Sequence, residues 1–223
     1  MVRPTITTVS ELKGKKIADP QLGGTQDVAL RWFLKSNGFQ SDTSGGGDVS
    51  VLPQDNSQTL TAFRQGDIDG AWVPEPWASR LVVEGGGRVL VDERELWPQG
   101  RFVTTNLVVR TAFVQAHAKR IRALLEGLYQ AVDFLQGQPA QAGRFANDSI
   151  AQITGKKLAS GVVADALPHL TFTLDPLAAT LEVSAEHAQA VGLLQKVDLK
   201  GLYDLAPLNE VLAMHNQTAV TGL

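Results

Sequence analysis

The sequence predicts an α/β fold with a mainly parallel sheet, followed by a helical C-terminal segment. Before residue 110, short β-rich runs alternate with helical patterns, which is typical of βαβ units. After that point apolar residues keep helical spacing and strand signals become rare. We therefore expect two parts in the chain of 223 residues, an α/β lobe over 1–109 and a helical segment over 110–223.

The first half begins with a strand at 15–19, which leads through the turn 20–24 into a helix at 25–37 with one apolar face. Gly38 follows at the place where a left-handed residue ends a helix. The cycle then repeats with a strand at 48–52 and a helix at 56–65. The other elements expected here are a strand at 68–73, a helix from Pro76, which suits a first helical position, and strands at 88–91 and 102–109.

The second half is expected to hold helices at 118–135, 139–153, 158–167, 176–194 and 208–215. Amphipathic helices must bury their apolar faces against another layer. These helices either form a bundle or complete a lobe whose strands the chain does not contain. In the second case they expose apolar stripes, and we expect self-association. Two glycine runs, 45–47 and 85–87, are expected to be flexible turns.

Composition excludes several classes of protein. The 20 Lys and Arg residues balance 23 Asp and Glu residues without clustering, which argues against a nucleic-acid partner. The absence of Cys excludes disulfides, thiolate nucleophiles and Cys-ligated metals. No apolar run is long enough to span a membrane, and the first residues do not read as an export signal.

The segment 20–27 contains two glycines and connects the predicted strand at 15–19 to the predicted helix at 25–37. Glycines let a ligand approach the backbone, and the free N–H groups of a first helical turn favour an anion. Thr25 and Gln26 add side-chain donors. The alternative is an ordinary turn with Thr25 as a helix cap, and composition alone favours it because no nucleotide-phosphate motif is present.

The segment Trp72-Val73-Pro74-Glu75-Pro76-Trp77 follows a predicted strand. Ligands of open α/β sheets lie outside the carboxyl ends of the strands. Glu75 is placed to accept a hydrogen bond from a ligand, and the two tryptophans to form an apolar wall. The alternative, which the sequence supports equally, is that Trp72 belongs to the core and Glu75 complements the dipole of the following helix.

Catalytic patterns are weak. The four histidines stand far apart and are expected at the surface: His117, His169, His187 and His215. No nucleophile elbow or His-based metal motif occurs. We expect no enzyme activity, no metal and no cofactor.

Several segments resemble the nitrate/sulfonate/taurine branch of the periplasmic solute-binding proteins that serve ATP-binding-cassette importers. One segment is similar to the stretch that leads into the second lobe of such proteins: Ser10-Glu11-Leu12-Lys13-Gly14-Lys15-Lys16-Ile17-Ala18. The segments 21–29, 60–72 and 74–77 resemble this branch more specifically. The family's export signal and the part that supplies its first lobe are not found in this chain.

The resemblance implies a type II periplasmic-binding-protein lobe that binds a small anionic solute by lobe closure, without catalysis. An ABC permease and its ATPase are the implied partners, and a periplasmic or cell-surface location is implied. A singly charged ligand, such as an aliphatic sulfonate, taurine or nitrate, suits the turn better than a phosphate ester because the turn lacks Lys and Arg. The implied ligand-binding residues are Gln21, Gly24, Thr25 and Gln26 on one side and Trp72, Pro74 and Glu75 on the other.

Two alternatives stay open. One is a protein that binds or synthesises the thiamin pyrimidine precursor, since such proteins share the scaffold. The synthases use Cys and His in patterns that this sequence lacks. The other is a truncated relic that binds nothing.

Overall fold

The computed structural model describes residues 1–223, except for the side chain of Ser160, and the chain forms two compact units. Unit 1 contains Met1–Gly100, Leu158–Leu170 and Val183–Val197. Unit 2 contains Arg101–Lys157, Thr171–Glu182 and Asp198–Leu223. Two segments of the later sequence thus fold with the first hundred residues. The expected domains, 1–109 and 110–223, stay a prediction.

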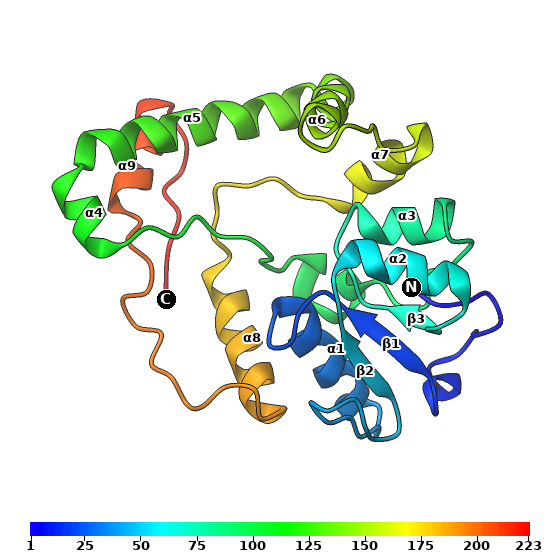
Figure 1. Ribbon diagram of the computed structural model, residues 1–223. Coiled ribbons are helices and arrows are strands. Elements are labelled where there is room, and N and C mark those ends of the chain that lie inside the picture. Colours follow the sequence, from blue (N-terminus) through cyan, green and yellow to red (C-terminus); the bar gives the residue numbers. More distant parts are fainter. The chain divides into compact units, whose positions relative to one another are not determined.

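A three-stranded parallel sheet forms the centre of unit 1, with strand order β2-β1-β3 (Figure 1). The strands are β1 (Lys16–Asp19), β2 (Ser50–Pro53) and β3 (Gly70–Ala71). Ile17 of β1 pairs with Val51 on one side and Gly70 on the other. The sheet and its alternation with helices confirm the predicted fold class.

Helices cover both faces of this sheet, as the alternation of side chains along β1 requires. They are α1 (Thr25–Ser36) on one face and α2 (Asn56–Gln65) and α3 (Trp77–Val83) on the other. Helix α7 (Ser160–Ala166) packs against α3, and the end of α8 (Ala178–Ala190) also belongs to unit 1. Ile17 lies in one core cluster with Leu30 and Leu34 of α1. Ala18 faces the other way and lies with Phe63 of α2 and Leu81 of α3. Both helical layers therefore depend on one four-residue strand.

Two expected strands are wrong. Arg88 forms only an isolated antiparallel bridge with Val2, which also bridges to Gly70 of β3. The N-terminus therefore occupies the place beside β3 where a further strand would pair. Residues 102–109 form no strand in the described structure, and Val108 is 87% exposed. An apolar run forms a strand only where the edge of a sheet is free to pair with it.

The glycine run 85–87 is a packing feature rather than a flexible turn. A Cβ atom on Gly85 would stand 2.7 Å from the carbonyl oxygen of Leu81 and 3.0 Å from the ring of Phe63. At Gly87 the corresponding distance to the Phe63 ring is 3.1 Å. The chain passes this close to the buried phenyl ring only because these residues lack side chains.

Unit 2 is helical and contains α4 (Thr111–Ala116), α5 (Ala118–Gly137), α6 (Pro139–Thr154) and α9 (Ala206–Met214). Ile121 and Leu125 of α5 bury their side chains against the Leu208, Val211 and Leu212 face of α9. These packed stripes agree with the helical spacing in the sequence. The short 3₁₀ helices of the described residues all belong to unit 1: η1 (Val9–Leu12), η2 (Glu93–Leu96), η3 (Pro98–Gly100) and η4 (Leu167–His169).

Helix α6 keeps large apolar side chains exposed, with Phe145 at 69% and Ile153 at 85%. Self-association through such helices stays a prediction. None of the described helices combines the length and the apolar character needed to cross a membrane.

We predict that Phe63→Ala destabilises unit 1 by about 3–5 kcal/mol, because it removes a buried ring and leaves a cavity. The side chain is 1% exposed and lies against the backbone at Gly85 and Gly87. All four tryptophans lie within Met1–Gly100, so tryptophan fluorescence during urea unfolding reports on this unit. Leu96→Ala, at a side chain that is 48% exposed, is the control and should change stability by less than about 0.5 kcal/mol. Equal effects of both substitutions would contradict the packing described.

Candidate functional site

The predicted site residues come together at one edge of the sheet in unit 1. Because the three strands are parallel, their carboxyl ends share an edge, and the chain leaves it at Asp19, Pro53 and Ala71. The Gln54 N–H donates to the Asp19 carbonyl at 2.9 Å, and the Trp72 N–H donates to the Ala18 carbonyl at 2.8 Å. The turn 20–24 and the segment 72–75 therefore start side by side.

The turn after β1 leaves donors available. Gly23 has φ +73°, a conformation that glycine adopts without strain, and Gly24 is the N-cap of α1. The Gly24 N–H donates to the Gln21 carbonyl at 3.0 Å and closes the turn. Because the cap has no side chain, the N–H groups of Thr25, Gln26 and Asp27 have no acceptor among the described residues. These three groups, with the positive end of the helix dipole, form an anion-binding arrangement.

The polar side chains at the start of α1 make few hydrogen bonds within the protein. The Thr25 hydroxyl donates to Gln26 Oε1 at 3.0 Å, and both lie near the surface. The Gln21 side chain is exposed. All four turn residues predicted as a ligand site thus lie at an open helix start, and an ordinary side-chain cap by Thr25 is not formed.

A buried ion pair underlies the turn. The Asp27 carboxylate accepts from the Gly23 N–H at 2.8 Å and from Arg31 Nε at 2.6 Å, with side chains that are 0% and 3% exposed. Arg31 Nη1 donates in turn to the Asp42 carbonyl at 2.7 Å. Asp27 therefore fixes the glycine from below, one turn inside α1. This role was not predicted from the sequence, although the i, i+4 spacing of an acid and a base on a helix was a signal for it.

Asp19 ends β1 directly beneath the same turn. Its Oδ1 accepts from the Gln21 N–H at 3.0 Å, whereas the fully buried Oδ2 has no partner among the described residues. Burial, followed by the nearby Asp27 charge, raises the pKa of Asp19 to about 7. A buried carboxyl with such a pKa is unusual in a purely structural position.

Trp72 is held by an acidic partner. Its Nε1 donates to Glu93 Oε2 at 2.7 Å, and its ring lies 5.3 Å from that of Phe33 at a tilted angle. The other Glu93 oxygen accepts from Trp97 Nε1 at 3.4 Å. Burial raises the pKa of Glu93, and the two indole hydrogen bonds oppose that rise. The Trp72 indole N–H is therefore used internally, and the ring packs against the core cluster of α1.

Both carboxylate oxygens of Glu75 also have partners within the protein. Oε2 accepts from the Ser79 N–H at 3.0 Å, in the first turn of α3, and Oε1 lies 2.8 Å from His169 Nδ1. Pro74 contributes its carbonyl to the Trp77 and Ala78 N–H groups of the same helix. In this state Glu75 caps α3, the alternative that the sequence left open, and its side chain is only 9% exposed.

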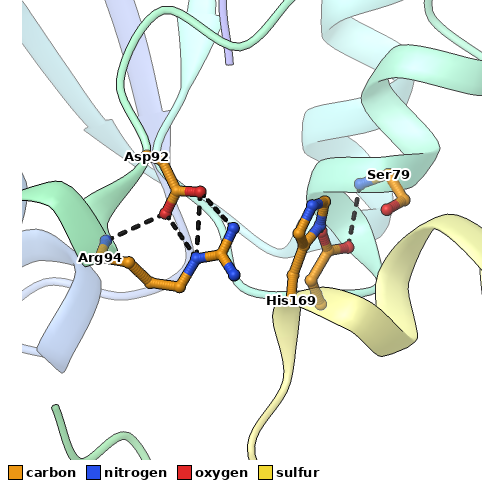
Figure 2. A network of polar contacts seen from close by, with 5 residues as sticks. Ser79, Asp92, Arg94 and His169 are labelled. Atoms are coloured by element: carbon orange, nitrogen blue, oxygen red, sulfur yellow. Dashed lines mark hydrogen bonds and ion pairs between the residues drawn. The ribbon is translucent and has the colours of Figure 1, made fainter. Parts of the chain in front are cut away.

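Arg94 and Asp92 form a neighbouring pair beside Glu75 and His169 (Figure 2). Arg94 Nη2 lies 2.5 Å from Asp92 Oδ2, and Arg94 Nε donates to Asp92 Oδ1 at 3.0 Å. These hydrogen bonds, more than the charge alone, lower the pKa of Asp92. The segment 92–94 thus adds a charged pair next to the end of the predicted site.

The histidines are less peripheral than the sequence predicts. Only His169 is exposed, and it is bound to Glu75. His187 stacks on Trp32 at 4.4 Å, His215 stacks on Tyr129 at 3.8 Å, and His117 lies against Phe113 at 4.5 Å. The flat imidazole packs against aromatic rings, a contact that spacing along the chain cannot reveal.

The chain matches the NMT1-like family over residues 4–150, a span that contains the whole predicted site. The protein belongs to the NMT1-like family. This match confirms the family resemblance seen in the sequence.

Curated relatives of the chain are binding proteins. The taurine-binding periplasmic protein of Escherichia coli (strain K12) is 30% identical over 131 residues, 59% of this chain and 38% of that protein. The nitrate/nitrite binding protein NrtA of Synechococcus elongatus is 30% identical over 155 residues, 69% of this chain and 32% of that protein. The chain therefore spans about two fifths or less of these relatives.

Solved structures share the fold. The periplasmic aliphatic sulphonate binding protein SsuA of Escherichia coli has a TM-score of 0.63 and 23% identity, covering 89% of this chain and 66% of that one. The alkanesulfonate-binding protein SsuA of Xanthomonas axonopodis pv. citri, bound to MOPS, has a TM-score of 0.62 and 23% identity, covering 87% and 64%. At this identity the likeness concerns the fold alone.

We predict that Glu75→Ala destabilises unit 1 by about 1–2 kcal/mol and His169→Ala by less than about 1 kcal/mol. The first substitution removes a helix cap and the histidine contact together, whereas the second removes one contact of a side chain that is 44% exposed. Urea unfolding followed by tryptophan fluorescence measures both. A larger loss for His169→Ala than for Glu75→Ala would contradict the capping role of Glu75.

Proposed function

We propose that this protein is a solute-binding component of an ABC importer and binds a small singly charged anion without catalysing a reaction. The observation that carries the proposal is the open first turn of α1, where three backbone N–H groups converge without an acceptor among the described residues. Relatives named for taurine and for nitrate/nitrite support an anionic solute. The taurine-binding relative is named as a periplasmic protein, and this supports a periplasmic location in the proposal.

In this proposal the anion lies against Gly24, Thr25 and Gln26, with Gln21 at the rim of the turn. Backbone dipoles supply the attraction, since the turn carries no Lys or Arg. Such a field suits one negative charge better than a phosphate ester. An aliphatic sulfonate, nitrate or the sulfonate group of zwitterionic taurine meets this requirement.

The segment 72–75 has a different role in the proposed site. Trp72 and Pro74 would line the space beside the anion with apolar surface, because the polar groups of this segment are engaged internally. A ligand ammonium group would reach Glu75 only by replacing His169 at Oε1. Ligands without a cationic group are therefore expected to leave the Glu75–His169 contact intact.

A thermal-shift panel tests the proposal with taurine, ethanesulfonate, nitrate, bicarbonate and the thiamin pyrimidine. A ligand that binds only the folded state stabilises it by RT ln(1 + [L]/Kd), about 2.7 kcal/mol at a hundredfold excess over Kd. A shift with at least one of the four anions is expected. A shift with the pyrimidine alone would favour the precursor-binding alternative, and no shift at all would contradict solute binding by this chain.

We predict that Gln26→Glu weakens binding of the anion by about tenfold or more. The substitution preserves side-chain size and places a negative charge beside the N–H groups that hold the ligand. It should leave stability unchanged or slightly raised, because an acidic residue in a first helical turn is favourable. Isothermal titration calorimetry with the anion that responds in the panel measures the loss.

Gln58→Glu is the matched control. Gln58 is an exposed residue in the first turn of α2, so the same change has the same effect on a helix dipole without adding a charge to the α1 turn. Its affinity should equal that of the unmodified chain. An equal loss of affinity in both variants would contradict a site at the start of α1.

A further inference from the structure

The buried carboxyl pair beneath the α1 turn belongs to a cluster of charged side chains whose polar atoms are not all paired. Asp19 Oδ2 is buried without a partner among the described residues. Asp27 lies within hydrogen-bonding reach of Asp19, and both are 0% exposed. Two ionised carboxylates that face each other repel, and neither has a proton to donate.

Arg31 balances only one of these charges. It pairs with Asp27 at 2.6 Å, its Nη1 donates to the Asp42 carbonyl, and its buried Nη2 has no partner among the described residues. The Arg31 charge lowers the pKa of Asp19, but burial and the Asp27 charge outweigh it. The neighbouring strands add no charge beside Asp19 at these positions: Pro53 is its partner on β2, and Trp72 follows the β3 residue that pairs with Ala18. With both carboxyls ionised, the cluster Asp19, Asp27 and Arg31 holds a net negative charge in the protein interior, which is unfavourable.

We infer that Asp19 and Asp27 hold one proton between them, and that this proton site is linked to occupancy of the anion site in the first turn of α1. With a proton on Asp19 Oδ2, the hydroxyl donates to Asp27, the unpartnered atom is satisfied and the cluster becomes neutral. Asp27 still accepts from Gly23 and Arg31, so the turn keeps its geometry. The pKa of Asp19, raised to about 7, agrees with this arrangement.

The link to the anion is electrostatic and rests on the proposed function. Asp27 supplies one of the free N–H groups at the helix start, and its side chain holds Gly23. A ligand charge at that turn therefore lies close to the carboxyl pair and favours its protonated form. By reciprocity, loss of the proton weakens binding of the anion. Above about pH 7 binding should take up a fraction of a proton, and affinity should fall with rising pH by up to tenfold per pH unit.

The first experiment needs no ligand. A carboxyl whose pKa is raised in the folded state stabilises the protein below its unfolded pKa and loses that contribution as pH rises towards the folded value. Asp19→Asn removes this titration, and its amide can donate to Asp27 permanently. The melting temperature of Asp19→Asn relative to the unmodified chain should therefore increase from pH 5 to pH 8, with the variant more stable at pH 8.

Asp67→Asn is the matched control, because Asp67 is exposed before β3, at the amino end of the sheet. Its difference in melting temperature should not follow the pH dependence of Asp19→Asn. Carbon-13 NMR of the aspartate carboxyl groups in the unmodified chain provides a second readout that needs no variant. One buried carboxyl should titrate near pH 7; the absence of such a resonance, or a pH-independent effect of Asp19→Asn, would overturn the proton pair.

The second experiment tests the link with nitrate, an anion that does not itself titrate in this range. Calorimetry at pH 7.5 in phosphate and in Tris counts the protons taken up, since the two buffers differ in ionisation enthalpy. Uptake is expected for the unmodified chain and for Asp67→Asn, and none for Asp19→Asn. Nitrate binding without uptake would overturn the link. No nitrate binding beside a confirmed carboxyl titration would contradict nitrate as the proposed solute while the proton pair stands.

Discussion

The contact between the Asp27 carboxylate and the Gly23 N–H determines how the chain passes from β1 into α1. Gly23 adopts a left-handed conformation, and its N–H is held from beneath by a residue one turn further along the helix. Arg31 compensates the charge of that residue inside the protein. Without this support the open helix start would be a loose glycine turn. With it, the unpartnered N–H groups of the first turn are fixed in position before any ligand arrives, which lowers the entropic cost of binding.

The candidate residues differ in what they still have to offer a ligand. The Trp72 indole N–H and both oxygens of Glu75 already have partners within the protein. The N–H groups at the start of α1 have none among the described residues. A polar group that is satisfied internally contributes shape, whereas an unsatisfied one contributes affinity. The turn after β1 is therefore the polar half of the proposed site, and the segment after β3 is its wall.

Segments from far along the chain stabilise this arrangement within unit 1. His169 reaches Glu75 across 94 positions of sequence, and His187 stacks on Trp32 of α1. Lys35 donates to the Ala190 carbonyl at 2.6 Å, which ties the end of α8 to the end of α1. The later helical sequence thus takes part in the unit that carries the site. Its local periodicity describes the helices but does not indicate with which unit they pack.

The sequence by itself determined the parallel α/β class, the helix at α1 and the family, because hydrophobic periodicity, glycine positions and short motifs are local properties of the chain. It also placed Gly24, Thr25 and Gln26 at a helix start. Tertiary structure decided what local patterns cannot contain: the use of Glu75 as a cap, the partner of Trp72, the failure of 88–91 and 102–109 to form strands, and the meeting of Asp19 with Asp27. Each of these depends on which groups compete for the same hydrogen bond or sheet edge. That competition is settled only when distant segments are brought together.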